Sequence, residues 1–239
     1  NNNKAVFVEK PTCRTLKEAV YLLQVEEAAI KRIGAGENDQ LVYPISQFSL
    51  ADADPVDSLG VNYKRDELYY SSSKWRGTWA KAGGGALFTH GWHVIQALIS
   101  NMEDSVVSVA CDLRNMWHDI EVEDYALVRL TDAAGNTFTR QIATAPFDLG
   151  HTWEPSSVLG DSHELLVKSF TEALHGEADP YNMTDACWMM MLITACYYSA
   201  YISKPVVLND LLRDPKTHPF FAGWQQQFVQ RQLQSVSSH

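Results

Sequence analysis

The chain has 239 residues, of which 46% are hydrophobic and 20% charged, the composition of a globular protein long enough to bury a sizeable core. Its formal net charge of -10 argues against the concentrated Lys/Arg surface that nucleic-acid binding needs, so we expect no nucleic-acid partner. The four cysteines are widely spaced and form no CxxC pair. This pattern predicts reduced thiols in a cytoplasmic protein rather than a zinc site or a disulfide framework.

The chain opens with the pattern of a strand followed by a helix. The apolar run at residues 5–8 predicts a strand that ends at Glu9-Lys10-Pro11, because proline cannot continue a ladder. Thr15–Glu18 has the spacing of a capping box, and apolar residues at helical spacing continue to about Ile33. The segment therefore predicts half of a parallel βαβ unit. Gly34–Gly36 follows the helix rather than the strand, which indicates a helix stop and not a dinucleotide-binding loop.

From Gln40 onward the sequence changes to β-branched and aromatic runs that are typical of strands. Ala134-Gly135-Asn136 predicts a hairpin turn, which indicates antiparallel pairing, and helical patterns return after Pro155. We therefore predict an α+β fold, with a large, mostly antiparallel (mixed) sheet covered by helices on one face. The predicted strands are residues 41–45, 61–70, 106–113, 125–130 and 137–143, and the predicted helices are residues 161–175, one from Thr184 and one or two short helices from Asp210.

The longest uncharged run, residues 186–203, is the only membrane candidate that the sequence offers. It is shorter than a span of about 20 apolar residues and is rich in Thr, Ser, Tyr and Cys, so it predicts a buried helix and no membrane partner. Asn1–Lys4 lead into an apolar run of only four residues, which does not indicate a signal peptide.

The most informative stretch is a triple glycine, Gly83-Gly84-Gly85, that leads into an apolar helix predicted over residues 86–98. On that helix Thr89, His93 and Gln96 stand at i, i+4 and i+7, so their side chains share one face. Such a polar stripe is either a solvated helix face or one wall of a binding site.

Several motifs follow one another in a specific order along the chain. Together they resemble the Gfo/Idh/MocA family of NAD(P)-dependent oxidoreductases, and they cover nearly the whole sequence. The motifs are Glu9-Lys10-Pro11 with its capped helix, Trp75-Arg76-Gly77-Thr78-Trp79, Gly83-Gly84-Gly85 with His93, residues 118–124 (HDIEVED), Tyr198-Ser199-Ala200 and residues 218–224 (HPFFAGW).

The resemblance implies a site for hydride transfer between NAD or NADP and a sugar, polyol or related cyclic alcohol. It implies that Lys10 and His93 are the catalytic acid–base pair. It also implies that Glu9, Lys10 and Pro11 border the cofactor, and that a carbohydrate-like substrate contacts the side chains of Arg76, Thr89 and Gln96.

The residue types suit this chemistry, although each also has a plain structural explanation. Burial at a strand end lowers the pKa of a lysine, and an imidazole that titrates near neutrality can share a proton transfer. Lys10 could equally be solvated, His93 could bond a backbone carbonyl, and Arg76 could simply stack on its flanking tryptophans. Thr89 and Gln96 occupy positions where many family members carry aspartate. We expect no metal, because His90 and His93 have no evident third ligand.

The resemblance also predicts the domain organisation. Residues 1–38 correspond to the end of a Rossmann dinucleotide-binding domain, and residues 39–239 correspond to the C-terminal sheet domain that binds substrate and mediates oligomerisation. The glycine-rich phosphate loop of the first domain has no counterpart in the sequence, which leaves the choice between NAD and NADP open. We expect a homo-oligomer formed through apolar and aromatic residues of the open sheet face. Two alternatives remain: a carbohydrate-binding or oligomerisation domain without redox activity, and a glycosidase that uses tightly held NAD.

Overall fold

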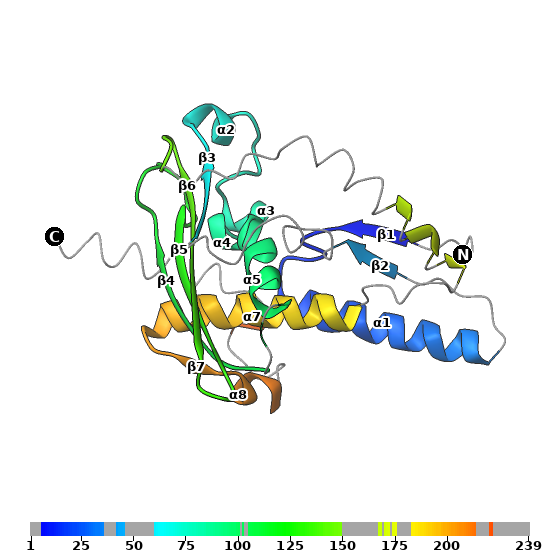
Figure 1. Cartoon of the computed structure of the whole chain (residues 1–239). Helices are drawn as coiled ribbons and strands as arrows, with labels where there is room; N and C mark the ends of the chain where they lie inside the picture. The colour runs from blue at the N-terminus through cyan, green and yellow to red at the C-terminus, as the bar shows by residue number, and fades with distance from the viewer. Residues whose placement is uncertain are drawn as a thin grey trace.

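The described residues form two sheets of unequal size, a parallel pair of strands and a sheet of five strands (Figure 1). We describe them from a computed structural model. The residues that the structure describes are 6–35, 42–45, 60–100, 102, 105–149, 167–168, 170–172, 174–175, 183–213 and 220–221.

The N-terminal unit is a parallel βαβ arrangement. β1 (Val6–Glu9) leads into α1 (Leu16–Gly34), and β2 (Val42–Ile45) then pairs with β1 in parallel, with Val6 opposite Val42. Sequence analysis groups residues 41–45 with the later strands, and this grouping is wrong. A four-residue run has too little pattern of its own to choose its partner, and pairing with β1 completes the unit that α1 begins.

The predicted capping box at the start of α1 is confirmed. The Glu18 backbone N donates to Thr15 Oγ1 at 3.2 Å, and Glu18 Oε2 accepts from the Thr15 backbone N at 3.1 Å. These bonds satisfy N–H groups that the first helical turn leaves without intrahelical partners. Leu16 and Ala19 are fully buried on the inner face of α1, which packs against α7 (Met183–Ile202).

The large sheet has the order β3-β6-β5-β4-β7. Its β4–β5, β5–β6 and β4–β7 pairs are antiparallel and its β3–β6 pair is parallel, so the predicted mixed, mostly antiparallel sheet is confirmed. The strands are β3 (Gly60–Lys64), β4 (Val106–Arg114), β5 (Tyr125–Asp132), β6 (Thr137–Ala145) and β7 (Val206–Val207).

The predicted hairpin between β5 and β6 is also confirmed. Gly135 takes a φ of 89°, which favours glycine, and the Asn136 backbone N donates to Asp132 Oδ1 at 2.7 Å. The Asp132 side chain therefore closes the turn that sets the register of both strands.

Helices cover one face of this sheet. Figure 1 shows α3, α4 and α5 on the same side of it, and α7 packs along β4. The predicted buried helix at residues 186–203 is confirmed as part of α7, whose side chains are buried on nearly every side. The helices around the large sheet are α2 (Glu67–Ser71), α3 (Trp79–Ala82), α4 (Ala86–Thr89), α5 (Gly91–Ser100), α7 and α8 (Leu208–Arg213). Over the described ranges, no helix combines the length and the apolarity that crossing a membrane requires.

The opposite face of the sheet carries the other half of each alternating strand. Ala126, Val128 and Leu130 of β5 are fully buried on the helix side, so Leu127 and Arg129 point away from it. The register places Asp112 and Gln141 on either side of Leu127. From the sequence we expect apolar and aromatic residues on this open face. The face instead combines apolar and polar side chains.

Two predicted elements differ from the structure. The strand predicted over residues 61–70 ends at Lys64, because Asp66 begins α2 by accepting a hydrogen bond from the Tyr69 backbone N at 2.9 Å. The helix predicted over residues 86–98 is broken at His90 into α4 and α5. Glycine at position 91 permits this break, since a Cβ there would lie 2.9 Å from Leu87 Cδ1.

The C-terminal motif at residues 218–224 falls mostly outside the described residues. Phe220 and Phe221 are described: Phe220 is fully buried against Tyr198 and Tyr201, and the Phe221 carbonyl accepts a hydrogen bond from the Lys17 backbone N at 2.9 Å. The motif therefore ties the C-terminal region to α1 and α7.

Candidate active site

The triple glycine faces the protein interior rather than a ligand. A Cβ added at Gly84 would meet the Tyr197 hydroxyl, and one at Gly85 would meet the backbone carbonyl oxygen of Glu123. Gly83 has a φ of 86° and ends α3. The glycines are required because two chain segments approach at backbone distance.

Glu123 is the group beneath these glycines. Its Oε1 accepts hydrogen bonds from the backbone N of Gly85 at 2.9 Å, from that of Leu87 at 3.1 Å and from the Tyr197 hydroxyl at 2.7 Å. Burial raises the pKa of Glu123 to about 7, although these bonds oppose the rise. Glu123 is 1% exposed, so we assign it to the support of α4 rather than to substrate contact.

Lys10 lies just beyond the carboxyl end of β1 and reaches the end of α4. Its Nζ donates to the Thr89 backbone carbonyl at 2.9 Å, a contact that joins residues 79 positions apart. Burial lowers the pKa of Lys10, and the neighbouring Glu9 carboxylate partly opposes that shift. The structure thus brings the predicted EKP lysine to the segment that carries His93.

His93 stands on α5 within the electrostatic reach of Lys10. Burial, followed by the charge of Lys10, lowers the pKa of His93 to about 3. Sequence analysis expects an imidazole that titrates near neutrality, and this expectation is wrong because the ring is buried beside a cation. Its Nδ1 is buried and has no hydrogen-bond partner among the described residues. With so low a pKa, the ring is uncharged at neutral pH.

Thr89 and Gln96 lie on either side of His93 in the sequence. The Thr89 hydroxyl donates to the Gly85 carbonyl at 2.7 Å, so it stabilises α4 while its backbone carbonyl holds Lys10. Gln96 is 7% exposed, and its Oε1 is buried without a partner in the part of the chain that the structure describes. Their proposed contact with substrate stays a prediction.

Glu9 and Pro11 flank the lysine. Glu9 is exposed, and its Oε2 accepts a hydrogen bond from the Lys10 backbone N at 3.1 Å. The Lys10–Pro11 peptide bond is cis. The cofactor contact predicted for Glu9, Lys10 and Pro11 also stays a prediction.

Arg76 makes its contacts with the segment around α2. Its Nη1 donates to the Tyr69 carbonyl at 3.2 Å and to Ser72 Oγ at 2.6 Å, while the guanidinium lies over the rings of Tyr69 and Trp75. None of its recorded contacts is to Lys10 or His93. The stacking on a flanking tryptophan that the sequence suggested for Arg76 is therefore present.

From the sequence, His90 drew attention only as a candidate metal ligand, and Tyr63 and Arg65, which the structure places next to it, were not singled out. The His90 ring stacks on Tyr63 with centroids 3.9 Å apart, and the Arg65 guanidinium lies 5.5 Å from the Tyr63 centroid. Burial, followed by the charges of Arg65, Lys10 and His93, lowers the pKa of His90 well below its ordinary value. One sequence signal could have located Tyr63 and Arg65. Asp66 is a typical helix N-cap, so the preceding strand must end just before it, and Tyr63 and Arg65 then lie at the end of that strand.

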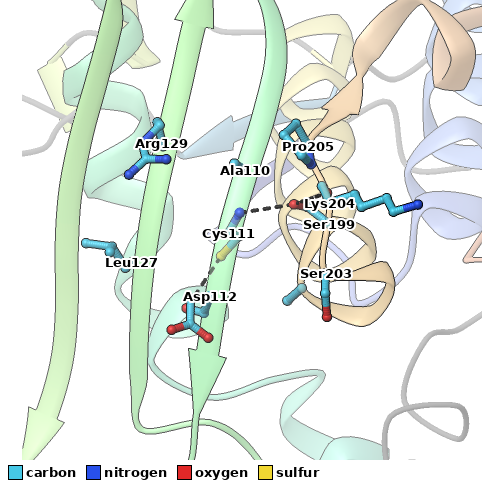
Figure 2. A pocket seen from close by; sticks show the side chains of 10 residues that line it. Ala110, Cys111, Asp112, Leu127, Arg129, Ser199, Ser203, Lys204 and Pro205 are labelled. Carbon is cyan, nitrogen blue, oxygen red and sulfur yellow. Dashed lines mark hydrogen bonds between the residues drawn. The ribbon is translucent and has the colours of Figure 1, made fainter.

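Two hollows lie away from Lys10 and His93. One, of about 660 Å³, is bordered by Arg76, His118 and Glu121 among others. The second, of about 360 Å³, lies along the edge of β4 (Figure 2). There Ser199 Oγ accepts from the Cys111 backbone N at 3.1 Å and donates to the Lys204 carbonyl at 2.7 Å. Ser199, which belongs to the Tyr198-Ser199-Ala200 motif, therefore satisfies the free edge of β4.

The titratable side chains of the described residues include no group of three or more that could hold a metal ion.

Comparisons with known proteins support the family resemblance. Residues 56–145 match the family model described as the GFO/IDH/MocA C-terminal domain. No curated protein matches the chain by sequence.

Solved structures share the fold at low sequence identity. The WlbA dehydrogenase from Bordetella pertussis, in complex with NADH and UDP-GlcNAcA, is 18% identical with a TM-score of 0.65, over 85% of this chain and 71% of its own. An aldose-aldose oxidoreductase from Caulobacter crescentus, complexed with glycerol, is 18% identical with a TM-score of 0.63, and the match covers 86% of this chain and 72% of that protein. An oxidoreductase from Agrobacterium radiobacter, in complex with NAD+, L-tartaric acid and magnesium, is 12% identical with a TM-score of 0.63, and the match covers 86% of this chain and 73% of that protein. Residues 56–145 thus match a GFO/IDH/MocA C-terminal domain, and the fold of the chain agrees with that of these solved structures.

Proposed function

We propose that this chain serves the transfer of a hydride between NAD or NADP and an alcohol carbon of a sugar, a polyol or a related cyclic alcohol. The observation that carries the proposal is the convergence of Lys10 and His93 from two separate elements. One bond, Lys10 Nζ to the Thr89 carbonyl, holds the end of β1 against the end of α4, and the His93 ring lies within the field of the same cation.

The two side chains are suited to complementary tasks. When an alcohol is oxidised, its hydroxyl proton must leave as the hydride departs, and a neutral imidazole can accept a hydrogen bond from that hydroxyl. Burial and Lys10 keep His93 uncharged, but a pKa of about 3 makes it a weak base, so the larger part of the proton transfer is assigned to Lys10. Lys10, whose pKa burial lowers, stabilises negative charge on the substrate oxygen and can exchange a proton with it.

The residues present fit a nicotinamide cofactor. Lys10 lies at the carboxyl end of a strand in a parallel pair, which is the edge where open α/β sheets bind ligands. Glu9, Lys10 and Pro11 would border the cofactor there. When bound, the nicotinamide accepts or donates the hydride. What the chain itself supplies is the lysine, the imidazole and their burial.

Substrate contacts are proposed for Thr89, Gln96 and Arg76. Gln96 has a buried amide oxygen without a recorded partner one turn beyond His93, so it can accept a hydrogen bond from a substrate hydroxyl. Thr89 retains acceptor capacity on its hydroxyl oxygen. Arg76 would contact only a substrate that extends toward α2, since its recorded contacts lie there.

The test measures reduction of NAD+ and of NADP+ with a panel of cyclic sugars and polyols, followed by absorbance of the reduced cofactor. We expect turnover by the wild type, a loss of about 10²- to 10⁴-fold in Lys10→Met, and no change in Lys31→Met, whose side chain is exposed on α1. Fluorescence titration with NADH separates cofactor binding from chemistry. Absence of turnover with every member of the panel, or unchanged turnover in Lys10→Met, would contradict the proposal.

We also propose that the chain self-associates through the open face of its large sheet. The helices lie on the opposite face, and cross-strand neighbours such as Leu127 and Gln141 are left without a covering layer among the described elements (Figure 1). Light scattering at micromolar concentration tests this, with a dimer or larger species expected. A Leu127→Glu variant that remains associated, or a monomeric wild type, would contradict it.

A further inference from the structure

A row of alternating aromatic and basic side chains runs from the Lys10–His93 pair toward α2. In order, its members are His90, Tyr63, Arg65, Tyr69 and Arg76, and we refer to them as the basic ladder. The Arg65 guanidinium lies 5.5 Å from the centroid of the Tyr63 ring and 4.7 Å from that of the Tyr69 ring. The Arg76 guanidinium lies 4.3 Å from the centroid of the same Tyr69 ring. The ladder begins at the His90–Tyr63 stack, beside Lys10.

Positive charge is concentrated here although the whole chain carries a formal net charge of -10. Lys10 and Arg65 both act on His90, and both lower its pKa. Within the described ranges, neither of them nor Arg76 takes part in an ion pair; the recorded pairs lie elsewhere. The acidic residues nearest in sequence have other roles, since Asp66 caps α2 and Glu9 accepts from the backbone. The Glu9 carboxylate partly offsets the charge of Lys10, whereas Arg65 forms no ion pair within the described ranges.

The two arginines of the ladder differ in how far their donors are used. Arg76 gives Nη1 to both the Tyr69 carbonyl and Ser72, and the hollow beside it is also lined by the acidic side chains of Glu67, Asp119 and Glu121. Arg65 has one hydrogen bond, from Nη1 to the Lys64 carbonyl at 3.0 Å, against two for Arg76, while the buried Nε of each arginine has no acceptor among the described residues. Arg65 is thus the better anion-binding group.

We infer that the substrate of this site carries an anionic group, a carboxylate or a phosphate, and that Arg65 binds it as the specificity-determining residue. This inference rests on the proposed function, because it assigns a substrate class to the same Lys10–His93 site. A guanidinium presents a planar pair of donors that matches a carboxylate or phosphate. Cation–π contacts with Tyr63 and Tyr69 restrict the guanidinium before a ligand arrives, which reduces the ordering cost of binding.

The phosphates of a nicotinamide dinucleotide are a second possible source of the anion. We commit to the substrate because Arg65 lies beyond β3 in the large sheet, on the side of His90 that leads toward α2, whereas the strand predicted to border the cofactor is β1. Separate titrations with a sugar acid and with NADH distinguish the two sources.

The experiment compares binding of D-glucuronate with that of D-glucose by isothermal titration calorimetry. The pair differs in one carboxylate, so the difference in affinity reports on anion recognition. We expect the wild type to bind glucuronate about 10-fold or more tightly than glucose. Arg65→Gln should weaken glucuronate binding by about 10- to 100-fold and leave glucose and NADH binding unchanged. Arg65→Lys, which keeps the charge without the planar pair, should lie between them.

The matched control is Arg213→Gln, which removes an exposed arginine at the end of α8 and should change none of these affinities. Thermal unfolding followed by circular dichroism establishes whether each variant is folded. If Arg65→Gln does not fold, the comparison of glucuronate with glucose in the wild type and in Arg65→Lys still decides the inference.

Equal binding of the two sugars by the wild type, or an unchanged preference in a folded Arg65→Gln variant, overturns the inference. So does a variant that loses affinity for NADH and not for glucuronate, because Arg65 would then serve the cofactor. Failure of the proposed function looks different. In that case glucuronate binds as expected and depends on Arg65, but no sugar is oxidised in the presence of NAD+ or NADP+.

Discussion

Two buried clusters of titratable groups lie close together in the fold and differ in what surrounds them. In the first, Glu123 Oε1 accepts three hydrogen bonds from protein donors and the residue is 1% exposed beneath the triple glycine. In the second, His93 Nδ1 has no recorded acceptor or donor, and Lys10 holds a single backbone carbonyl. A shifted pKa occurs in both, so the shift alone does not identify a catalytic site. Each cluster also holds one buried atom without a partner among the described residues, Glu123 Oε2 and His93 Nδ1. The difference is that three protein donors hold the Glu123 carboxyl in place, whereas the Lys10–His93 cluster is held by one side-chain bond to a backbone carbonyl.

Replacing Lys10 is the change that should separate the clusters most strongly. In Lys10→Met we expect turnover to fall by about 10²- to 10⁴-fold, because the substrate oxygen loses its cation, while thermal stability changes little. Steady-state kinetics and thermal unfolding measure the two effects. A large loss of stability with intact turnover would reverse the roles assigned to the clusters.

Substituting Gly85 tests the structural cluster in the opposite way. In Gly85→Ala the new Cβ would overlap the backbone carbonyl of Glu123, and we expect the free energy of unfolding to fall by about 3 kcal/mol or more. Gly135→Ala is the matched control: its φ of 89° strains alanine, but no atom lies within 4 Å of the added Cβ, so it should cost about 1 to 2 kcal/mol. Denaturant unfolding measures both. Equal costs would mean that the close approach at Gly85 can relax.

The pH dependence of Glu123 sharpens the same contrast. Its pKa is about 7 in the folded protein, against an ordinary value of 4.5, so the folded state holds this proton while the unfolded state has lost it. Between these values, the contribution of Glu123 to the free energy of unfolding therefore falls as pH rises, by up to about 1.4 kcal/mol per pH unit. Above pH 7 that loss is complete.

A Glu123→Gln variant lacks this titration. The difference in unfolding free energy between Glu123→Gln and the wild type should shift in favour of the variant as pH rises from 5 to 8. A difference that stays constant over this range would show that Glu123 is ionised throughout.

Thr89 belongs to both clusters and gives the smallest effect. Thr89→Val removes the hydroxyl bond to the Gly85 carbonyl and should cost about 1 kcal/mol of stability. The backbone carbonyl that holds Lys10 remains, so turnover should change only as far as the Thr89 hydroxyl contacts substrate. A rise in KM would support that contact, and a loss of turnover as large as that of Lys10→Met would contradict the separation of roles.

Local sequence signals predicted the elements whose chemistry is local. The capping box at Thr15 and the hairpin turn at Gly135 depend on residues within a few positions of each other, and both form as expected. The choice of β1 as the partner of β2 and the burial of the triple glycine against Glu123 depend on segments far apart in the chain, so no local pattern encodes them.

The residues of the candidate site also fall into two groups, those that the sequence predicts and those that only the structure reveals. Family motifs predicted Lys10 and His93, because Lys10 directly precedes a proline and His93 follows the triple glycine at a fixed spacing. Arg65 and Tyr63 were not predicted, because they belong to residues 61–70, which the sequence pattern assigned wholly to a strand. Their role emerges only when the break at His90 brings its ring onto Tyr63, which is a consequence of packing rather than of pattern.

The central claim, that Lys10 and His93 act as one unit, is tested most directly by NMR titration of the His93 ring in the wild type and in Lys10→Met. We expect the wild-type ring to stay neutral down to at least about pH 5, since burial and the lysine lower its pKa to about 3. Removal of the cation should raise that pKa measurably. A His93 ring that titrates near 6.5 in the wild type, or that titrates identically with and without Lys10, would contradict the account.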